Sequence, residues 1–248
     1  MSASIAFLHR PAHVEGQTPS PVLTRDLLEK GCIDALVAID SPGLKLLTDA
    51  DRTASLDQIL SMRPRGDVWI FGYGSLIWNP AIESVEKRIA KIDDWHRSLC
   101  LSITALRATS DRPGLMLALD RGGSCYGAAY RLAEAQVERE LHLLWRREMV
   151  CGAYVPHWIE LKGIDDEALG WSIAFTIDAQ APQYAGGLDE DTVVYRLATA
   201  SGGLGSSADY LFKTCESLRA NGIHDARLER LAARVQAAQE ADRGLARA

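Results

Sequence analysis

The sequence predicts an α+β fold in which a small mixed or antiparallel, barrel-like sheet is flanked by helices. Three observations predict this fold. Short apolar stretches typical of buried strands recur from residue 68 onward. A single amphipathic helix, over residues 134–147, interrupts these strands. Helical patterns precede the first strand and follow Pro182, so helical extensions are expected at both ends of the sheet.

The N-terminal part of the chain is interpreted as an extension, residues 1–66, on a main domain that spans residues 67–248. Residues 1–21 are punctuated by proline and glycine without periodicity, which indicates a tail or a packed extension. Apolar spacing then predicts one helix over residues 23–37 and a second over residues 50–62.

Strands and helices of the main domain follow from the same two periodicities. Strands are expected at residues 68–71, 86–92, 97–103, 114–119, 124–132, 153–161 and 171–177. Helices are expected after Pro182 at residues 189–200, 208–220 and 225–241. The pair Gly122-Gly123 predicts a hairpin turn between two of the strands.

Composition limits the possible functions. Of the 248 residues, 47% are hydrophobic and 24% charged, which is typical of a globular protein with a sizeable core. The net charge of -6 argues against nucleic acid as the main partner. No apolar run is long enough for a membrane span and no secretory signal is recognised, so the cytoplasm is the expected location.

The cysteines and histidines indicate neither disulfides nor a metal site. The five cysteines are odd in number and widely spaced, as expected of free thiols in a reducing compartment. They are Cys32, Cys100, Cys125, Cys151 and Cys215. No His or Cys spacing typical of a local metal site is present, so no metal is predicted.

A glycine-rich turn at residues 72–80 (GYGSLIWNP) directly follows the first strand. Two glycines let the backbone approach a ligand closely, and successive N–H groups in such a turn can bind a carboxylate. The turn lacks the third glycine of a dinucleotide fingerprint, the Gly-Lys-Ser of a phosphate loop and the elbow of a serine hydrolase. The alternative is a purely structural turn around a buried Tyr73.

Glu148 interrupts the expected pattern of charges on the helix at residues 134–147. Val137, Leu141 and Leu144 form one apolar stripe, and at ~100° per residue Glu148 projects only ~20° from Val137. An inward carboxyl has a raised pKa and can exchange a proton near neutral pH. Alternatively, Glu148 pairs with an arginine, turns to solvent, or lies beyond the end of the helix.

Arg107, Tyr184 and Tyr210 are further candidates. Arg107 follows a predicted strand and is suited to hold a carboxylate with two hydrogen bonds. Tyr184 lies in a Pro-Gln-Tyr-Ala-Gly-Gly loop, where its phenol is able to reach a ligand. Tyr210 begins an apolar helical run and is expected in the core. For each of them, a surface ion pair or a packed aromatic ring is the alternative.

Two segments resemble the bacterial ChaC branch of the gamma-glutamylcyclotransferases: residues 68–80 (VWIFGYGSLIWNP) and residues 143–149 (LLWRREM). The resemblance covers about residues 23–231. Further similar segments follow in order at residues 95–97, 113–119, 127–132 and 205–211. The Tyr-Gly-Ser-Leu motif is moderately specific alone and strong together with the later Arg-Glu motif.

The resemblance implies a barrel-like fold of the gamma-glutamylcyclotransferase type, no cofactor, and Glu148 as the acid/base. It also implies that the Tyr-Gly-Ser-Leu turn binds a gamma-glutamyl group. The expected substrate-binding residues are Phe71, Gly72, Tyr73, Gly74, Ser75, Leu76, Arg107 and Tyr184. One departure concerns Arg107, because relatives usually have Gly-Arg-Gly where this chain has Leu106-Arg107-Ala108.

The function expected from the resemblance is cleavage of glutathione to 5-oxoproline and Cys-Gly. The substrate α-amine attacks its own γ-carbonyl, and neither nucleic acid nor a membrane takes part. One alternative is the same chemistry on other gamma-glutamyl amines or amino acids. A second is a non-catalytic regulator that binds a transporter. A third is a hydrolase that uses Cys100 or Cys151 as nucleophile.

Overall fold

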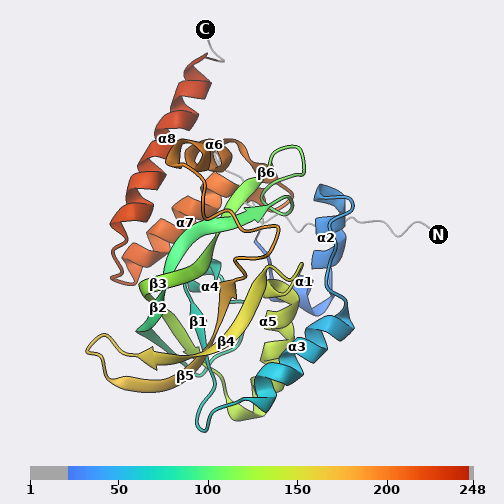
Figure 1. Ribbon diagram of the computed structural model, residues 1–248, viewed down its shortest axis with the longest axis vertical. Coiled ribbons are helices and arrows are strands. Elements are labelled where there is room, and N and C mark those ends of the chain that lie inside the picture. Colours follow the sequence, from blue (N-terminus) through green and yellow to red (C-terminus); the bar gives the residue numbers. More distant parts are fainter. Residues whose placement is uncertain (1–21, 246–248) are drawn as a thin grey trace, which may run out of the picture.

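A closed five-stranded barrel forms the centre of the protein, as seen in a computed structural model that describes residues 22–245 (Figure 1). The predicted tail at residues 1–21 lies outside the described residues. The strand order around the barrel is β1-β3-β2-β4-β5. The strands are β1 (Trp69–Gly72), β2 (Glu86–Ile103), β3 (Gly114–Arg131), β4 (Tyr154–Lys162) and β5 (Ala168–Ile177). Since β1 pairs antiparallel with β3 and parallel with β5, the sheet is mixed, and the predicted fold class is confirmed.

Helices cover two sides of the barrel. Figure 1 shows α6, α7 and α8 together on one side, and α1, α2 and α3 on the other, near α5. The helices are α1 (Arg25–Glu29), α2 (Ile33–Asp40), α3 (Asp49–Ser61), α4 (Ser75–Trp78), the 3-10 helix η1 (Glu134–Gln136), α5 (Val137–Glu148), α6 (Glu190–Thr199), α7 (Ser207–Ala220) and α8 (Ala226–Leu245). Two short strands, β6 (Ser201–Gly202) and β7 (Gly205–Ser206), pair before α7. Within residues 22–245, no helix is long and apolar enough to cross a membrane.

Local signals in the sequence explain where several helices begin. Thr48 caps α3 and Ser206 caps α7, each in a capping box with an aspartate three residues later. Asp189 caps α6 by accepting a hydrogen bond from the backbone N–H of Thr192. The predicted helix at residues 50–62 and the helices after Pro182 are confirmed, apart from shifts of one or a few residues at their ends.

The hairpin predicted at Gly122-Gly123 is wrong. Both glycines lie inside β3, which runs without interruption beside an equally long β2. They adopt positive φ angles of 94° and 72° and stand opposite Asp94, which has a φ of 66°. Two residues therefore face one across the ladder, which is a β-bulge that bends both strands instead of ending them. The four strands predicted at residues 86–132 are consequently two.

The helix predicted at residues 23–37 is also wrong in part, because the chain forms two short helices there. Gly31, with a φ of 65°, separates α1 from α2. A further element was not predicted: the glycine-rich turn continues into α4, a single helical turn.

The main core joins the barrel strands to the helices around them, and α5 packs into it through its apolar stripe. Trp145 of α5 meets Phe175 of β5 edge to face, with ring centroids 5.2 Å apart. Val137, Leu141 and Leu144 are buried in the same core. This packing fixes which side of α5 faces inward, and therefore where its last residue points.

Candidate active site

The glycine-rich turn joins β1 to α4, and its glycines are required by close contacts. A Cβ atom on Gly74 would lie 2.7 Å from the Tyr210 hydroxyl, and one on Gly72 would lie 2.9 Å from the Cβ of Leu76. Both distances are too short for a side chain to fit without displacing its neighbour. The turn is therefore packed tightly against α7 and against its own helical turn.

Two hydrogen bonds from outside hold the backbone of the turn in place, and a third, donated by a side chain of the turn, ties it to the barrel. Arg97 donates to the carbonyl of Tyr73 at 2.6 Å, and the Tyr130 hydroxyl donates to the carbonyl of Leu76 at 2.8 Å. The Tyr73 hydroxyl in turn donates to the carbonyl of Phe175, on the neighbouring strand β5, at 2.7 Å. The turn is thus a rigid part of the barrel rather than a loose loop.

Glu148 is the last residue of α5, and its carboxyl group lies in the same small pocket as the turn. Its side chain is only 14% exposed. The pocket is lined by Tyr73, Gly74, Ser75, Leu76, Met116, Leu117, Glu148, Tyr154, Phe175 and Tyr210. The inward direction predicted from helical periodicity is therefore confirmed, and the predicted end of the helix moves by one residue.

Arg147 connects the carboxyl group to the turn. Its guanidinium lies 2.9 Å from the Glu148 carboxylate and donates to the Ser75 hydroxyl, also at 2.9 Å. It also donates to the carbonyls of Asn79 and Pro80, just beyond α4. Burial raises the pKa of Glu148, and the neighbouring Arg147 only partly opposes this rise. The alternative in which Glu148 pairs with an arginine is thus realised inside the pocket, not on the surface.

Tyrosine side chains form the remaining polar walls of the pocket. The Tyr154 hydroxyl donates to the carbonyl of Leu117 at 2.8 Å, and the Tyr210 hydroxyl accepts from the N–H of Leu117 at 3.3 Å. Burial raises the pKa values of Tyr73, Tyr154 and Tyr210, so all three phenols stay neutral near pH 7. They present uncharged hydroxyl groups to whatever the pocket holds.

Some of the predicted substrate-binding residues lie outside the pocket. Phe71 and Gly72 lie in β1 behind the turn, and Phe71 is fully buried in the core. Tyr184 packs against the same buried cluster as Met116 and Tyr154, which do line the pocket, but its hydroxyl donates to Asp120 at 2.8 Å. These positions place Phe71, Gly72 and Tyr184 in a supporting layer in this structure.

Arg107 is buried next to the pocket wall. Its guanidinium lies 5.7 Å from the centre of the Trp78 ring and 6.0 Å from that of Tyr210. Its hydrogen bond to the carbonyl of Ser206 is long, at 3.3 Å. Burial lowers the pKa of Arg107, and the attraction of nearby acidic groups offsets this effect only in part. The preceding Leu106 has a φ of 66°, a conformation that favours glycine.

Neither the predicted thiol nucleophiles nor a metal cluster accompany this pocket. Burial raises the pKa of Cys100 to about 12 and also raises that of Cys151, so both remain unreactive thiols at neutral pH. No group of three or more metal-ligating side chains gathers in the part of the chain that the structure describes. The hydrolase alternative loses its basis, because a thiol nucleophile acts as a thiolate.

Sequence reasoning misses the role of Arg147 and the part of the pocket wall that the strands β3, β4 and β5 provide. Periodicity explains Arg147 only as a positive charge near the end of a helix. Its position directly before Glu148 is a signal that could have pointed to an ion pair between them. Met116, Leu117, Tyr154 and Phe175 come from three different strands, and no sequence pattern brings them together.

The pocket is small as it stands, with a volume of about 20 Å³. That is room for about one water molecule. A larger hollow of about 490 Å³ lies beside Trp95 and Lys162, but none of the predicted site residues lines it. A ligand of the size of an amino acid needs more room than the small pocket offers, and the unbranched Met116 is among the side chains that border the pocket.

Comparison with known proteins gives a consistent result. The model of the ChaC-like protein family matches residues 68–238. A glutathione-specific gamma-glutamylcyclotransferase of Escherichia coli is 44% identical over 207 residues, 82% of this chain and 88% of the relative. A human glutathione-specific gamma-glutamylcyclotransferase 1 is 30% identical over 70% of this chain and 82% of its own. A crystal structure of a yeast gamma-glutamyl cyclotransferase specific to glutathione has the same fold, with a TM-score of 0.64 at 18% identity, over 69% of this chain and 96% of the yeast chain.

Proposed function

Because the chain belongs to the ChaC-like protein family, we propose that it is a gamma-glutamylcyclotransferase that cleaves glutathione to 5-oxoproline and Cys-Gly. One observation carries the proposal: a buried carboxyl group, Glu148, shares a pocket with the backbone of a glycine-rich turn. Its raised pKa suits a group that takes up and releases a proton near neutral pH.

The reaction needs no nucleophile from the enzyme, because the substrate amine attacks. It needs a proton carrier and a substrate that is held in place. Glu148 takes a proton from the substrate α-ammonium group, and the freed amine attacks the γ-carbonyl carbon to close a five-membered ring. The carbon–nitrogen bond to the cysteinyl residue then breaks as Glu148 returns the proton to the departing nitrogen. After ring closure the ring nitrogen gives up a second proton, which passes to the freed amine of Cys-Gly. The α-nitrogen thus loses two protons, the departing nitrogen gains two, and Glu148 ends as it began.

The glycine-rich turn is suited to hold the gamma-glutamyl group. The first N–H groups of a helical turn have no acceptor within the helix, so those near Gly74, Ser75 and Leu76 are available to a carboxylate or an oxyanion. Because the attacking amine and the carbonyl belong to the same molecule, holding them in the right orientation should supply much of the rate acceleration. Because Arg147 binds both Ser75 and Glu148, the binding turn and the proton carrier are held by one guanidinium.

Arg107 is our candidate for a second carboxylate contact. Its lowered pKa indicates that burial of the guanidinium is not fully compensated, and a substrate carboxylate would relieve that cost. Tyr184, Phe71 and Gly72 support the walls of the pocket rather than contact the substrate in this proposal. The substrate is thus a small anionic peptide, and we place the enzyme in the cytoplasm, in keeping with its five free cysteines.

The test compares 5-oxoproline release from glutathione by the wild type and by Glu148→Gln. The amide keeps the shape of the side chain but cannot carry a proton, so kcat is expected to fall by roughly 10²–10⁴-fold. Wild-type activity in the Gln variant would show that another group carries the proton. A parallel assay with gamma-glutamyl-alanine tests the alternative substrate class, because an enzyme specific for glutathione turns it over much more slowly.

A further inference from the structure

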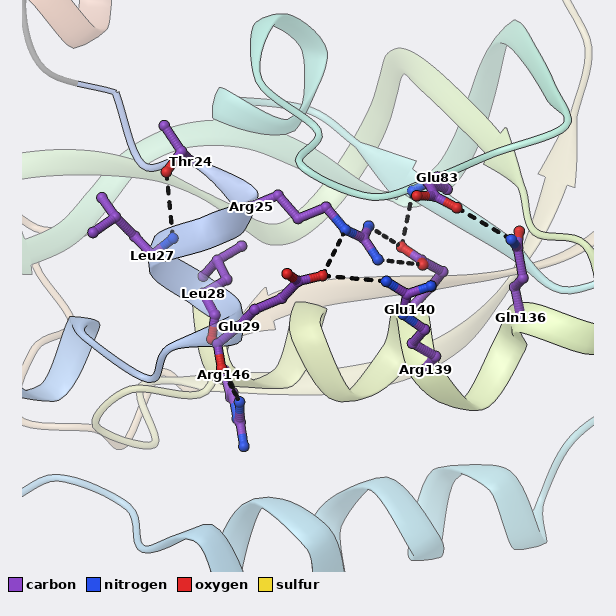
Figure 2. Close-up of polar contacts among 10 residues, drawn as sticks. All are labelled: Thr24, Arg25, Leu27, Leu28, Glu29, Glu83, Gln136, Arg139, Glu140 and Arg146. Carbon is purple, nitrogen blue, oxygen red and sulfur yellow. Dashed lines mark hydrogen bonds and ion pairs between the residues drawn. The ribbon is translucent and has the colours of Figure 1, made fainter. Parts of the chain in front are cut away.

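The helical extension before the barrel, residues 22–66, holds α5 at its beginning. Arg25 of α1 donates two hydrogen bonds of 2.7 Å to the carboxylate of Glu140, as Figure 2 shows. Glu140 is fully buried and also accepts from the backbone N–H of Glu83 at 2.8 Å. In the same view Glu29 binds both Arg25 and Arg139, which ties α1 to α5 a second time. These bonds fix the first turns of α5.

The same extension holds α5 at its end, next to Glu148. Arg52 of α3 is buried, and its Nε donates to the carbonyl of Met149 at 3.0 Å. Met149 is the C-cap residue of α5, directly after Glu148. The other two guanidinium nitrogens of Arg52 bind the carboxylate of Asp34 in α2, at 2.9 and 2.7 Å. One of them also donates to the exposed Asp49 of α3, at 3.2 Å. One arginine thus joins two helices of the extension to the end of α5.

Two further hydrogen bonds, one from a backbone N–H and one from a tryptophan ring, join the extension to residues near the end of α5. The N–H of Leu47 donates to the carbonyl of Val150 at 2.9 Å, and the Trp145 ring N–H donates to the Ser55 hydroxyl at 3.2 Å. Carbonyl groups at the end of a helix lack partners within it, and a cation is favourable at that end. The two carbonyls that follow Glu148, those of Met149 and Val150, are therefore both bound by the extension.

We propose that Arg52 is a positioning residue for Glu148. By holding the carbonyl of Met149, it fixes the last turn of α5, and with it the distance between the Glu148 carboxyl group and the glycine-rich turn. The inference rests on the proposed function, since it takes Glu148 as the proton carrier. Arg52 lies before residue 68, where the match to the family model begins, so the role belongs to the extension. The competing explanation is that Arg52 only stabilises the fold through Asp34.

Three variants separate these explanations. Arg52→Met removes the donor to Met149 together with the ion pairs to Asp34 and Asp49. Asp34→Asn weakens the ion pair but leaves the bond to Met149 in place, and is the matched control. Arg52→Lys keeps one cationic donor that can reach Met149 but loses the two-nitrogen contact with Asp34. For each, we would measure kcat and KM for 5-oxoproline release from glutathione, per mole of folded protein, and the midpoint of unfolding in urea.

We expect kcat of Arg52→Met to fall roughly 10- to 100-fold while KM stays within about threefold, because small displacements of a reacting group are costly. Asp34→Asn should keep kcat within about twofold of the wild type although its midpoint falls, and Arg52→Lys should regain most of kcat without regaining the midpoint. A kcat that follows the midpoint through all the variants, or equal kcat values for Arg52→Met and Asp34→Asn, would overturn the inference.

Two provisions keep the test decisive. If Arg52→Met does not fold, Arg52→Leu replaces it, since leucine carries no hydrogen-bond donor for Met149, and the same results are expected. If the wild type itself releases no 5-oxoproline, the proposed function fails and the inference fails with it. An active wild type with unaffected Arg52 variants overturns the inference alone.

Discussion

Glu148 experiences two opposing influences on its pKa. Burial raises the pKa, the adjacent guanidinium of Arg147 lowers it, and burial prevails. The native protein therefore binds a proton at this carboxyl more tightly than the unfolded chain does. Such a group favours folding fully below its unfolded pKa, and this contribution is lost as the pH rises through the higher folded pKa.

The pH dependence of protein stability tests directly whether folding raises the pKa of Glu148. Since Glu148→Gln cannot titrate, its free energy of unfolding relative to the wild type should rise with pH from about 4.3, the ordinary glutamate pKa, and level off above the folded pKa. A difference of one between the folded and unfolded pKa values corresponds to about 1.4 kcal/mol of stability. Urea unfolding of both proteins between pH 4 and pH 8 measures the difference, in which other titrating groups cancel. A difference that stays constant over this range contradicts a raised pKa.

At this scale the sequence predicted the direction of Glu148 but not its surroundings. A period of 3.6 residues is enough to place Glu148 on the apolar stripe of α5. The positions of Arg107 and Tyr184 depend on loops that pack against distant strands, so spacing along the chain carries no information about them. Arg147 was missed as the link to Ser75 for the same reason, because the two residues meet only after the barrel closes.

Among the elements, α5 depends most on a single buried ion pair. Burial alone would raise the pKa of Glu140, but the hydrogen bonds from Arg25 and from the backbone of Glu83 more than compensate and hold its pKa below the ordinary value. Removal of one partner from a buried pair leaves a charge without compensation. The start of α5 is therefore expected to be sensitive to changes in α1.

Arg25→Met should lower the free energy of unfolding by about 3 kcal/mol, at the low end for a buried pair because Arg25 is partly exposed. Arg63→Met is the matched control. Arg63 also lies in the extension and donates two hydrogen bonds to a carboxylate, but that carboxylate, Glu134, is 74% exposed. Arg63→Met should lower the free energy of unfolding by no more than about 1 kcal/mol. Urea unfolding measures both, and equal losses would contradict a special role for the Glu140 pair.

The long strands β2 and β3 show what the sequence could not predict about individual elements. Alternation of apolar and polar residues gave their location, but two glycines in succession are typical of a hairpin and also of a bulge. The choice between the two depends on whether the partner strand continues. Asp94, in a left-handed conformation opposite the glycines, allows it to continue.

Across the whole molecule, the helical extension and the barrel share their cores. Leu28 and Val37 of the extension form a cluster with Leu143 of α5, and Leu56 and Ile59 of α3 belong to the main core of the barrel. The sequence set residues 1–66 apart from the rest, because the contacts that join the two parts are far apart along the chain. Neither apolar periodicity nor capping motifs report such contacts.

Shared cores predict that the extension does not unfold before the barrel. Trp145 and Trp158, which donate hydrogen bonds to α3 residues Ser55 and Ile59, will change their fluorescence when the extension leaves the barrel. Far-ultraviolet circular dichroism reports the helices and strands as a whole. If the two parts form one cooperative unit, both signals will give the same urea midpoint and slope. Arg25→Met should move both midpoints together, whereas an earlier fluorescence transition would mean that the extension is a separate, weaker unit.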